Sequence, residues 1–296
     1  MIKILKDWTL PIAMCIGLLG YPLLIKLAFL LPTLIFLMLL FTFSKISVKD
    51  LRPRMLHLWL LLVQAGGTLG VYYLLRGVDE VLAQAVMVCV ICPTATSAAV
   101  ITGKLGGNAA SVSTYTFMAN MATAVAVPVF FPIVEPMAQV GFVEAFWVIF
   151  QRVFVLLICP FLLALFIRRV ARGLHARMVA HTDVAFYLWA FSLAIVTSRI
   201  LDSLLNYSAD WGIAGLIALG TLVVCCLQFF LGKSIGGWYN DRISGGQALG
   251  QKNTVLAIWM AHAYLNPLAA IGPGFYVFWQ NMINSWQLIR KLRMEN

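Results

Sequence analysis

The sequence has few acidic residues, and none of them falls in the middle of an apolar run. Only 11 of the 296 residues are Asp or Glu. They lie in loops or at the ends of apolar runs: Asp7, Asp50, Asp79, Glu80, Glu135, Glu144, Asp183, Asp202, Asp210, Asp241 and Glu295. Intramembrane carboxylates commonly act as proton carriers or cation ligands. The sequence offers no acidic residue for either role.

The sequence also lacks the usual motifs of catalytic and metal sites. It contains no paired acids, no zinc-type His/Glu spacing and no nucleotide-binding loop, which argues against an intramembrane enzyme. The six cysteines lie inside apolar runs without metal-ligand spacing: Cys15, Cys89, Cys92, Cys159, Cys225 and Cys226. We interpret them as small hydrophobic residues rather than a disulfide framework. We expect no enzymatic activity and no cofactor, with sodium as the one candidate ion.

Apolar residues dominate the composition. They make up 62% of the chain, whereas charged residues make up 11%, far below the roughly 25% of a soluble domain. The net charge of +10 comes from lysines and arginines in short loops, as in membrane proteins that carry cations on their cytoplasmic side. The composition therefore predicts an all-α polytopic membrane protein whose partner is the lipid bilayer, not a nucleic acid.

Ten apolar runs are long enough to be candidate spanning helices. They cover residues 8–25, 28–44, 55–75, 81–103, 108–132, 146–166, 184–204, 212–232, 243–265 and 269–289. The chain divides into two halves of five, residues 1–135 and 136–296. The third run of each half carries a lone glutamine, Gln64 or Gln228, and the fourth is broken by polar residues. Because five crossings separate the halves, we expect an inverted repeat, an architecture common in secondary transporters.

The loop charges predict the orientation. One side holds sixteen cations: Lys3, Lys6, Lys45, Lys49, Arg52, Arg54, Lys104, Arg168, Arg169, Arg172, Arg177, Lys233, Arg242, Arg290, Lys291 and Arg293. The other side holds Lys26, Arg76, Arg152 and Arg199. The excess predicts that both termini are cytoplasmic.

Polar residues interrupt the fourth and ninth runs. The first interruption follows Pro93, which removes a backbone donor and opens the helix, and it offers Thr94, Thr96 and Ser97. The second offers Gln251, Lys252, Asn253 and Thr254. For a helix that begins near Ile243, Lys252 lies about 14 Å deep in a core about 30 Å thick. Intramembrane charges are rare and usually functional, whereas the alternative is a lysine that snorkels to the interface.

Two further polar sets have competing interpretations. Thr116, Asn120 and Thr123 share one face of the fifth helix, where they either line a cavity or join helices by hydrogen bonds. We interpret Gln228 as interhelical hydrogen bonding and keep Gln64 as a candidate ligand.

These motifs resemble the bile acid:sodium symporter family over essentially the whole chain. The resemblance rests on Cys92-Pro93-x-x-Thr96 with Gly107-Asn108-Ala109-Ala110, on Gly250-x-x-Asn253-Thr254-x-Leu256-Ala257, and on Trp279-Gln280-Asn281. It implies interleaved core and panel domains, with fourth and ninth helices that break and cross. It also implies alternating-access transport of small organic anions across a bacterial inner membrane. Bile acids, steroid sulfates, pantoate-like acids and keto acids all fit this expectation.

The family's sodium ligands carry over only in part. Its serine, asparagine, glutamate and glutamine ligands fall on Ala98, Ala99, Ala248 and Lys252, and one hydroxyl ligand falls on Val112. Gln64 and Thr116 remain as residues of a residual sodium site. We therefore hypothesise that the Lys252 ammonium replaces a sodium ion, held by Gln64 and crossover carbonyls, in a sodium-independent or proton-coupled carrier.

Two alternatives stay open. One is a conventional sodium symporter that binds the ion through carbonyls, Gln64 and Thr116. A gapped alignment that places the family's Glu on Gln247 and its Gln on Gln251 would favour this alternative. The other is a membrane sensor that binds a ligand without moving it.

Overall fold

A computed structural model describes residues 9–46, 51–136, 140–181, 183–206 and 211–295. Every regular element in these ranges is a helix, and six helical segments are long and apolar enough to cross a membrane. They are Tyr21–Lys45, Met55–Leu75, Ala109–Val134, Phe142–Val170, Val184–Asn206 and Trp211–Gly237. The chain is therefore an α-helical, multi-pass membrane protein, as its composition predicts. Lys3, Lys6, Asp7, Lys49, Asp50, Asp210 and the start of the first predicted run lie outside the described residues.

The chain forms two compact units, and each unit takes segments from both halves of the sequence. Unit 1 comprises residues 1–45 and 152–210, and unit 2 comprises residues 46–151 and 211–296. Helix α9 (Phe142–Leu157) runs across the boundary between the two residue sets.

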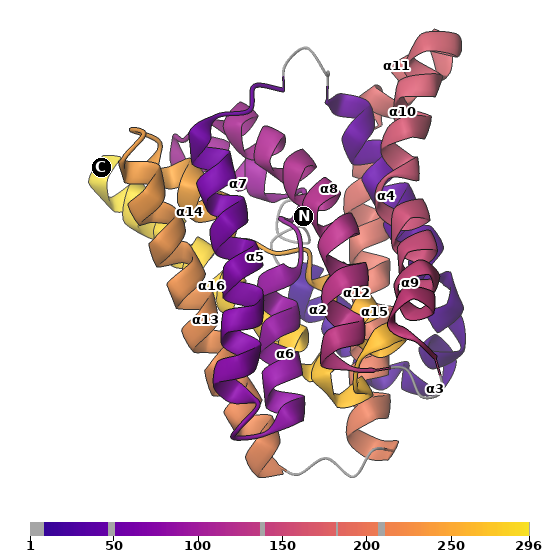
Figure 1. Cartoon of the computed structure of the whole chain (residues 1–296). Coiled ribbons are helices and arrows are strands. Elements are labelled where there is room, and N and C mark those ends of the chain that lie inside the picture. The colour runs from indigo at the N-terminus through magenta and orange to yellow at the C-terminus, as the bar shows by residue number, and fades with distance from the viewer. Residues whose placement is uncertain (1–8, 47–50, 137–139, 182, 207–210, 296) are drawn as a thin grey trace. The chain divides into compact units, whose positions relative to one another are not determined.

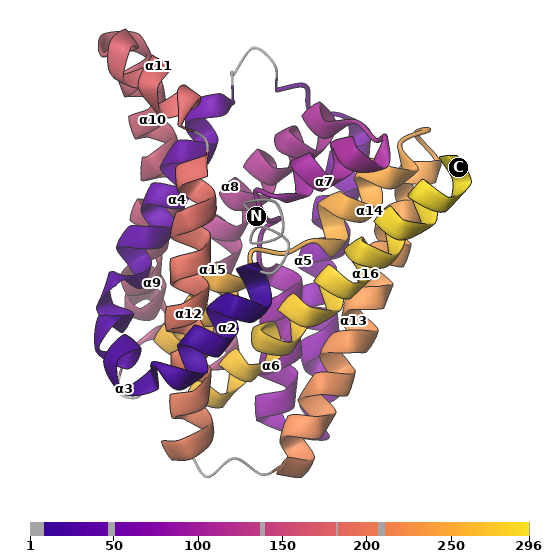
Figure 2. The ribbon, with the colours of Figure 1, turned by 180° about the vertical axis from the view of Figure 1, so that it is seen from behind.

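Unit 1 is built around one long helix. Its elements are α2 (Thr9–Leu19), α3 (Tyr21–Leu24), the 3-10 helix η1 (Ile25–Leu30), α4 (Leu31–Lys45), α10 (Cys159–Val170), α11 (Arg172–Ala180) and α12 (Asp183–Asn206). Helix α12 packs against α2 and α4, which Figure 2 shows on either side of it. The Ser198 hydroxyl donates to the Gly17 carbonyl at 2.7 Å. A Cβ atom at Gly17 would come within 2.5 Å of the Ala194 carbonyl, so this glycine permits the close approach of α2 and α12.

Two predicted runs of unit 1 differ from the helices observed. The run predicted at 28–44 is part of a longer helical segment, Tyr21–Lys45, in which α3, η1 and α4 follow one another. The run predicted at 146–166 is divided into α9 and α10, and α10 has Pro160 in its first turn. A proline there has no N–H to donate to the preceding turn, which weakens the helix at this point, and α9 and α10 follow one another within one apolar segment, Phe142–Val170.

Unit 2 holds both interrupted helices. Its elements are α5 (Met55–Leu75), α6 (Glu80–Ile91), α7 (Ala98–Leu105), α8 (Ala109–Val134), α13 (Trp211–Gly237), α14 (Arg242–Gly250), α15 (Thr254–Tyr264), the 3-10 helix η3 (Pro267–Ala270) and α16 (Ile271–Glu295). Figure 1 shows α5 beside α6, and Figure 2 shows α13 beside α16. The fourth and ninth runs are each interrupted where the sequence predicts, after Ile91 and after Gly250.

Glycines set the spacing between α13 and α14. A Cβ atom at Gly245 would meet the Gly232 carbonyl and would come within 2.9 Å of the Gly236 Cα. A Cβ atom at Gly250 would come within 2.5 Å of the Phe229 ring. Small residues of this kind let helix backbones approach closely inside a membrane. The close contact fixes α14, and with it the residues that lead to Lys252.

Candidate functional site

The two interruptions of unit 2 cross each other and pair through their backbones. Thr94 and Lys252 form an antiparallel bridge. The Asn253 N–H donates to the Pro93 carbonyl at 2.9 Å, and the Ala95 N–H donates to the Gln251 carbonyl at 3.0 Å. Non-helical backbone at membrane depth requires such partners, because lipid supplies none. The crossing therefore supplies partners for several of the groups that each break exposes.

The C-terminal end of α6 is closed by side chains from three other helices and from the interruption between α14 and α15. Its last carbonyls have no partner within the helix, and together they carry the negative end of the helix dipole. Gln228 Nε2 donates to Cys89 O at 3.5 Å, Lys252 Nζ to Val90 O at 2.9 Å, Gln64 Nε2 to Ile91 O at 2.7 Å and Cys92 O at 3.3 Å, and Thr123 Oγ1 to Ile91 O at 3.0 Å. All four carbonyls thus receive a donor, and one of the donors is a cation.

Lys252 is the charged member of this cluster, and its side chain is only 1% exposed. Gln280 on α16 holds its backbone on both sides. The Lys252 N–H donates to Gln280 Oε1 at 2.8 Å, and Gln280 Nε2 donates to the Lys252 carbonyl at 3.2 Å. Among the described residues, no acidic side chain pairs with the ammonium. A backbone carbonyl and the helix dipole stabilise this charge, as carbonyls stabilise a bound metal cation.

The hydrogen bonds give Gln64 a different role from the one in the hypothesis. Gln64 binds the carbonyls next to Val90 rather than the ammonium itself, so the predicted direct contact with Lys252 is wrong. Its Oε1 accepts a hydrogen bond from the Tyr115 hydroxyl at 2.9 Å. Gln64 is a cap of α6 that acts beside Lys252. The sequence could not show this, because backbone acceptors leave no mark in a residue pattern.

The chain matches no protein-family model and none of the curated proteins with which it was compared. The family resemblance of its motifs therefore remains a prediction, and the site has to be interpreted from its own geometry.

Most of the other residues predicted for the site lie at the crossing. Thr94 Oγ1 donates to the Ala248 carbonyl at 2.6 Å, and Gln251 Nε2 donates to the exposed Ser97 hydroxyl at 2.8 Å. Asn253 Oδ1 caps α15 by accepting from the Leu256 N–H at 3.3 Å.

Of the two remaining predicted residues, Thr254 bonds within the crossing and Thr96 does not. The Thr254 N–H donates to the Lys252 carbonyl at 3.0 Å. Thr96 is half-buried and its hydroxyl bonds to no residue that the structure describes. The predicted residues are thus gathered in one place, but most of them hold the crossing together rather than stand free for a ligand.

The predicted polar face of α8 bonds mainly to its own helix. Thr116 Oγ1 donates to the Val112 carbonyl at 2.9 Å, and Asn120 Nδ2 donates to the Thr116 carbonyl at 2.7 Å. Only Thr123 reaches another helix, at Ile91. Asn120 Oδ1 is buried without a partner among the described residues, which leaves one acceptor on this face.

Two tyrosines at the crossing were not predicted. Tyr115 supports Gln64, and the Tyr276 hydroxyl donates to the Gly250 carbonyl at 2.7 Å while it accepts from Gln228 Nε2 at 3.0 Å. The contact confirms Gln228 as an interhelical hydrogen-bonding residue. Tyr276 and Gln280 are four residues apart and so share a face of α16. That spacing is a signal that the sequence does contain.

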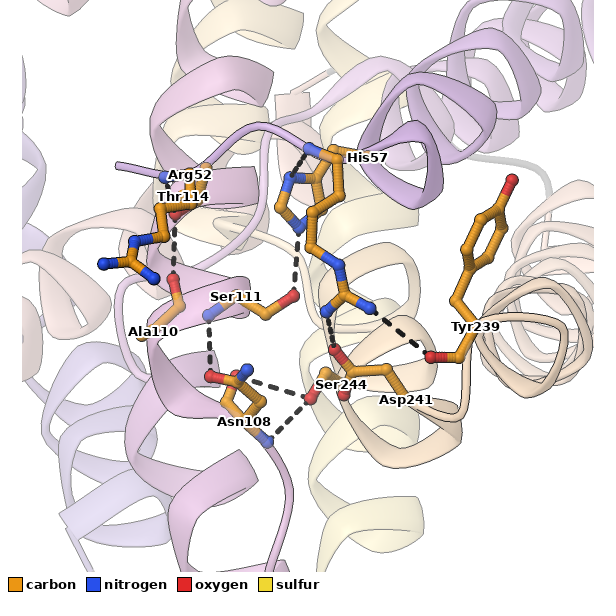
Figure 3. A network of polar contacts seen from close by, with 10 residues as sticks. Arg52, His57, Asn108, Ala110, Ser111, Thr114, Tyr239, Asp241 and Ser244 are labelled. Carbon is orange, nitrogen blue, oxygen red and sulfur yellow. Dashed lines mark hydrogen bonds and ion pairs between the residues drawn. The ribbon is translucent and has the colours of Figure 1, made fainter. Parts of the chain in front are cut away.

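A second polar cluster joins the α13–α14 turn to the starts of α5 and α8 (Figure 3). Arg54 Nη1 lies 2.9 Å from Asp241 Oδ2, and the Asn108 N–H donates to Ser244 Oγ at 2.8 Å. His57 Nε2 lies 3.0 Å from Ser111 Oγ.

The geometry of the His57–Ser111 pair argues against a nucleophilic serine. His57 Nδ1 accepts a hydrogen bond from the Arg54 N–H at 3.3 Å, so this nitrogen carries a lone pair. The proton of a neutral ring is then on Nε2, which donates to Ser111. A general base needs the opposite tautomer to take the serine proton.

Proposed function

We propose that the chain is a secondary transporter of small organic anions that works by alternating access, with Lys252 as a fixed cation in place of a bound ion. The observation that carries the proposal is the buried Lys252 ammonium, which caps the broken helix α6 where a second broken helix crosses it. Broken helices that meet near the membrane midplane are typical substrate and ion sites of secondary transporters. The starts of α7 and α15 lie beside the crossing, and helix N-termini favour anionic groups.

The division of the chain supports the same proposal. Each of the two units takes segments from both halves of the sequence. A pair of interleaved panel and core domains built from two inverted five-helix repeats would divide in this way. In this proposal unit 1 is the panel, unit 2 is the core, the membrane is the bacterial inner membrane, and both termini are cytoplasmic.

The lysine would act in one of two ways. As a permanent cation it would hold the end of α6 in place, so that transport needs no sodium. As a proton carrier it would lose and regain a proton during the cycle. Both versions require the amine of Lys252. Methionine has a similar volume but offers neither a charge nor a donor to Val90, so it tests this requirement.

Transport by the Lys252→Met variant tests the proposal. We expect loss of anion uptake into proteoliposomes, screened with a panel of bile acids, steroid sulfates and keto acids. The Val90 carbonyl would lose its donor, at about 1–3 kcal/mol, so the melting temperature of the variant is measured first to establish that it folds. Lys104→Met is the matched control, since the Lys104 side chain is exposed. Full uptake by Lys252→Met would refute both versions of the proposal.

The second candidate is a sodium-coupled symporter of organic anions. The Gln64 hydrogen bonds weigh against it, because its oxygen accepts from Tyr115 and its amide group donates to the Ile91 carbonyl, whereas the Thr116 hydroxyl donates within α8 and keeps its lone pairs. The melting temperature of the purified protein in sodium, potassium and choline chloride at equal ionic strength separates the two. A ligand that binds only the folded state stabilises it by about 2.7 kcal/mol at 100 times its Kd. A rise specific to sodium would favour the symporter.

A membrane sensor on the same scaffold is the third candidate. It would bind an anion without accumulating it in proteoliposomes. A carrier would bind the anion and also accumulate it.

A further inference from the structure

The α5 start, the α7–α8 turn and the α13–α14 turn of unit 2 surround a groove of about 800 Å³. Its charged lining residues are Arg54, Asp241 and Arg242, and the remainder includes Gly106, Gly107 and Gly237. Small-molecule sites usually measure about 300–1,000 Å³. The groove therefore has the volume for a small organic molecule, and it is separate from the crossing at Lys252.

The charges of the groove favour an anion. The groove is lined by two arginines, Arg54 and Arg242, and by one aspartate, Asp241, so its cations outnumber its anions. Asp241 is only 8% exposed and pairs with Arg54, whereas Arg242 is exposed and pairs with no residue that the structure describes. The positive ends of α8 and α14 add to the excess, because both helices begin at the groove.

Asp241 occupies the N-cap position of α14 but makes no side-chain hydrogen bond to that helix. Aspartate at an N-cap normally accepts from the first turn. Here its carboxylate accepts a hydrogen bond from Arg54 Nη1 at 2.9 Å instead. Asp241 therefore fills the place at Arg54 that a carboxylate from outside the protein could fill.

Three glycines line the groove beside Asn108, Asn240 and Ile243: Gly106, Gly107 and Gly237. Gly106 has φ of 85°, a conformation that favours glycine, and Asn240 at the groove has φ of 55°. A Cβ atom at Gly237 would meet nothing within 4 Å. Gly237 therefore leaves open space at the groove, whereas the Ile243 side chain fills the space at Gly107.

We propose that this groove is a binding site for a small organic carboxylate, which pairs with Arg242 and competes with Asp241 for Arg54. When the ligand takes Arg54, the Asp241 carboxylate is released to cap α14. That helix ends at Gly250, two residues before Lys252. The site goes beyond the proposed transport function and does not depend on it.

Succinate is the probe that tests the site. The melting temperature of the purified full-length protein is measured against succinate concentration, with potassium chloride at equal ionic strength and neutral succinamide as controls. We expect succinate to stabilise the protein beyond chloride. Binding to Arg242→Gln should be about three- to tenfold weaker, because that variant loses a charged partner.

The Asp241→Asn variant gives the more specific result. Each variant is compared with its own melting temperature without succinate. Asp241→Asn should bind succinate about two- to fivefold more tightly, because Arg54 loses its competing partner. A general effect of charge would also move these two variants in opposite directions, so Glu144→Gln, which removes a carboxylate outside the groove, has to leave succinate binding unchanged.

Arg290→Gln is the control, since Arg290 lies 5.5 Å over the Trp286 ring and does not line the groove. The test measures binding through the melting temperature and needs no uptake, so a failure of the transport proposal leaves it intact. Unchanged binding in Arg242→Gln would overturn the proposal by itself, even if Asp241→Asn does not fold.

Discussion

Gln280 holds the backbone of the lysine that the proposed mechanism needs. Its amide accepts from the Lys252 N–H and donates to the Lys252 carbonyl, and both Gln280 and Lys252 are buried. The amide thus replaces the two hydrogen bonds that a continuous helix would have given residue 252. The ammonium can point at Val90 only while its own backbone is fixed in this way.

Replacing Gln280 by leucine should therefore destabilise the protein. The buried Lys252 N–H would lose its partner, whereas the Lys252 carbonyl would keep the Thr254 N–H, so we expect a loss of about 1–3 kcal/mol. The measurement is unfolding of the purified protein in detergent, followed by circular dichroism. Asn281→Leu is the matched control, because the Asn281 side chain is half-buried and donates to Val277 O of its own helix. Equal stability of the two variants would contradict the role of Gln280.

The sequence reveals part of this arrangement. A lysine among apolar residues is visible without a structure, because its charge has to be accounted for. Its acceptor, the Val90 carbonyl, is not visible, since every residue carries the same carbonyl. For the same reason Gln64 was predicted as a ligand of the cation, although it caps the neighbouring carbonyls. The sequence shows that Lys252 and Gln64 are polar residues in apolar runs. The carbonyls that they contact are known only from the structure.

At the scale of elements, the contact between α13 and α14 depends on glycines that face one another. Gly245→Ala places a methyl group against the Gly232 carbonyl, and neither backbone can yield without moving a helix. We expect the variant to lose at least about 1–3 kcal/mol of stability, the usual cost of overpacking. The measurement is the melting temperature in detergent together with the yield of monodisperse protein. Gly237→Ala is the control, since its Cβ atom meets nothing within 4 Å, and an equal loss in both variants would contradict the packing argument.

The ends of helices can be predicted where a proline or polar residues interrupt an apolar run. Pro93 and the polar run before Lys252 mark the two breaks, because a missing donor or a polar group in an apolar run needs a partner elsewhere. The division between α9 and α10 was not predicted, although Pro160 was available as a signal. That proline lies in an otherwise apolar run, and hydropathy alone cannot show that the helix is interrupted there. The approach of α13 to α14 was missed for a different reason, because glycines show that a backbone can approach but not which backbone does.

At the scale of the whole molecule, the proposed topology makes a direct prediction. With both termini cytoplasmic, a green fluorescent protein fused after Asn296 should fluoresce, and alkaline phosphatase fused at the same point should be inactive. A phosphatase fusion truncated after Gly77, beside Arg76 on the side with few cations, should be active. An active phosphatase at the C-terminus would contradict the orientation and the count of ten crossings.

The two units illustrate what the order of runs along a chain cannot give. The sequence divides into halves at about residue 135, whereas each compact unit draws on both halves. The predicted inverted repeat would divide the chain into two consecutive halves. Which helices pack together in space depends on contacts between residues far apart in the sequence. The resemblance to a transporter family implied interleaved domains, and residue patterns alone did not.

The side chains that donate to the last carbonyls of α6 come from both early and late parts of the chain. Val90 and its lysine are separated by 162 positions, and Cys89 and Gln228 by 139. While the ribosome has made only the first half, the end of α6 already exists, but two of its four partners have not been synthesised. During that interval the exposed carbonyls need water, lipid headgroups or an insertion factor. The end of α6 can therefore be completed only after residue 252 has been synthesised. A chain truncated before residue 228 should leave two of these carbonyls without their donors.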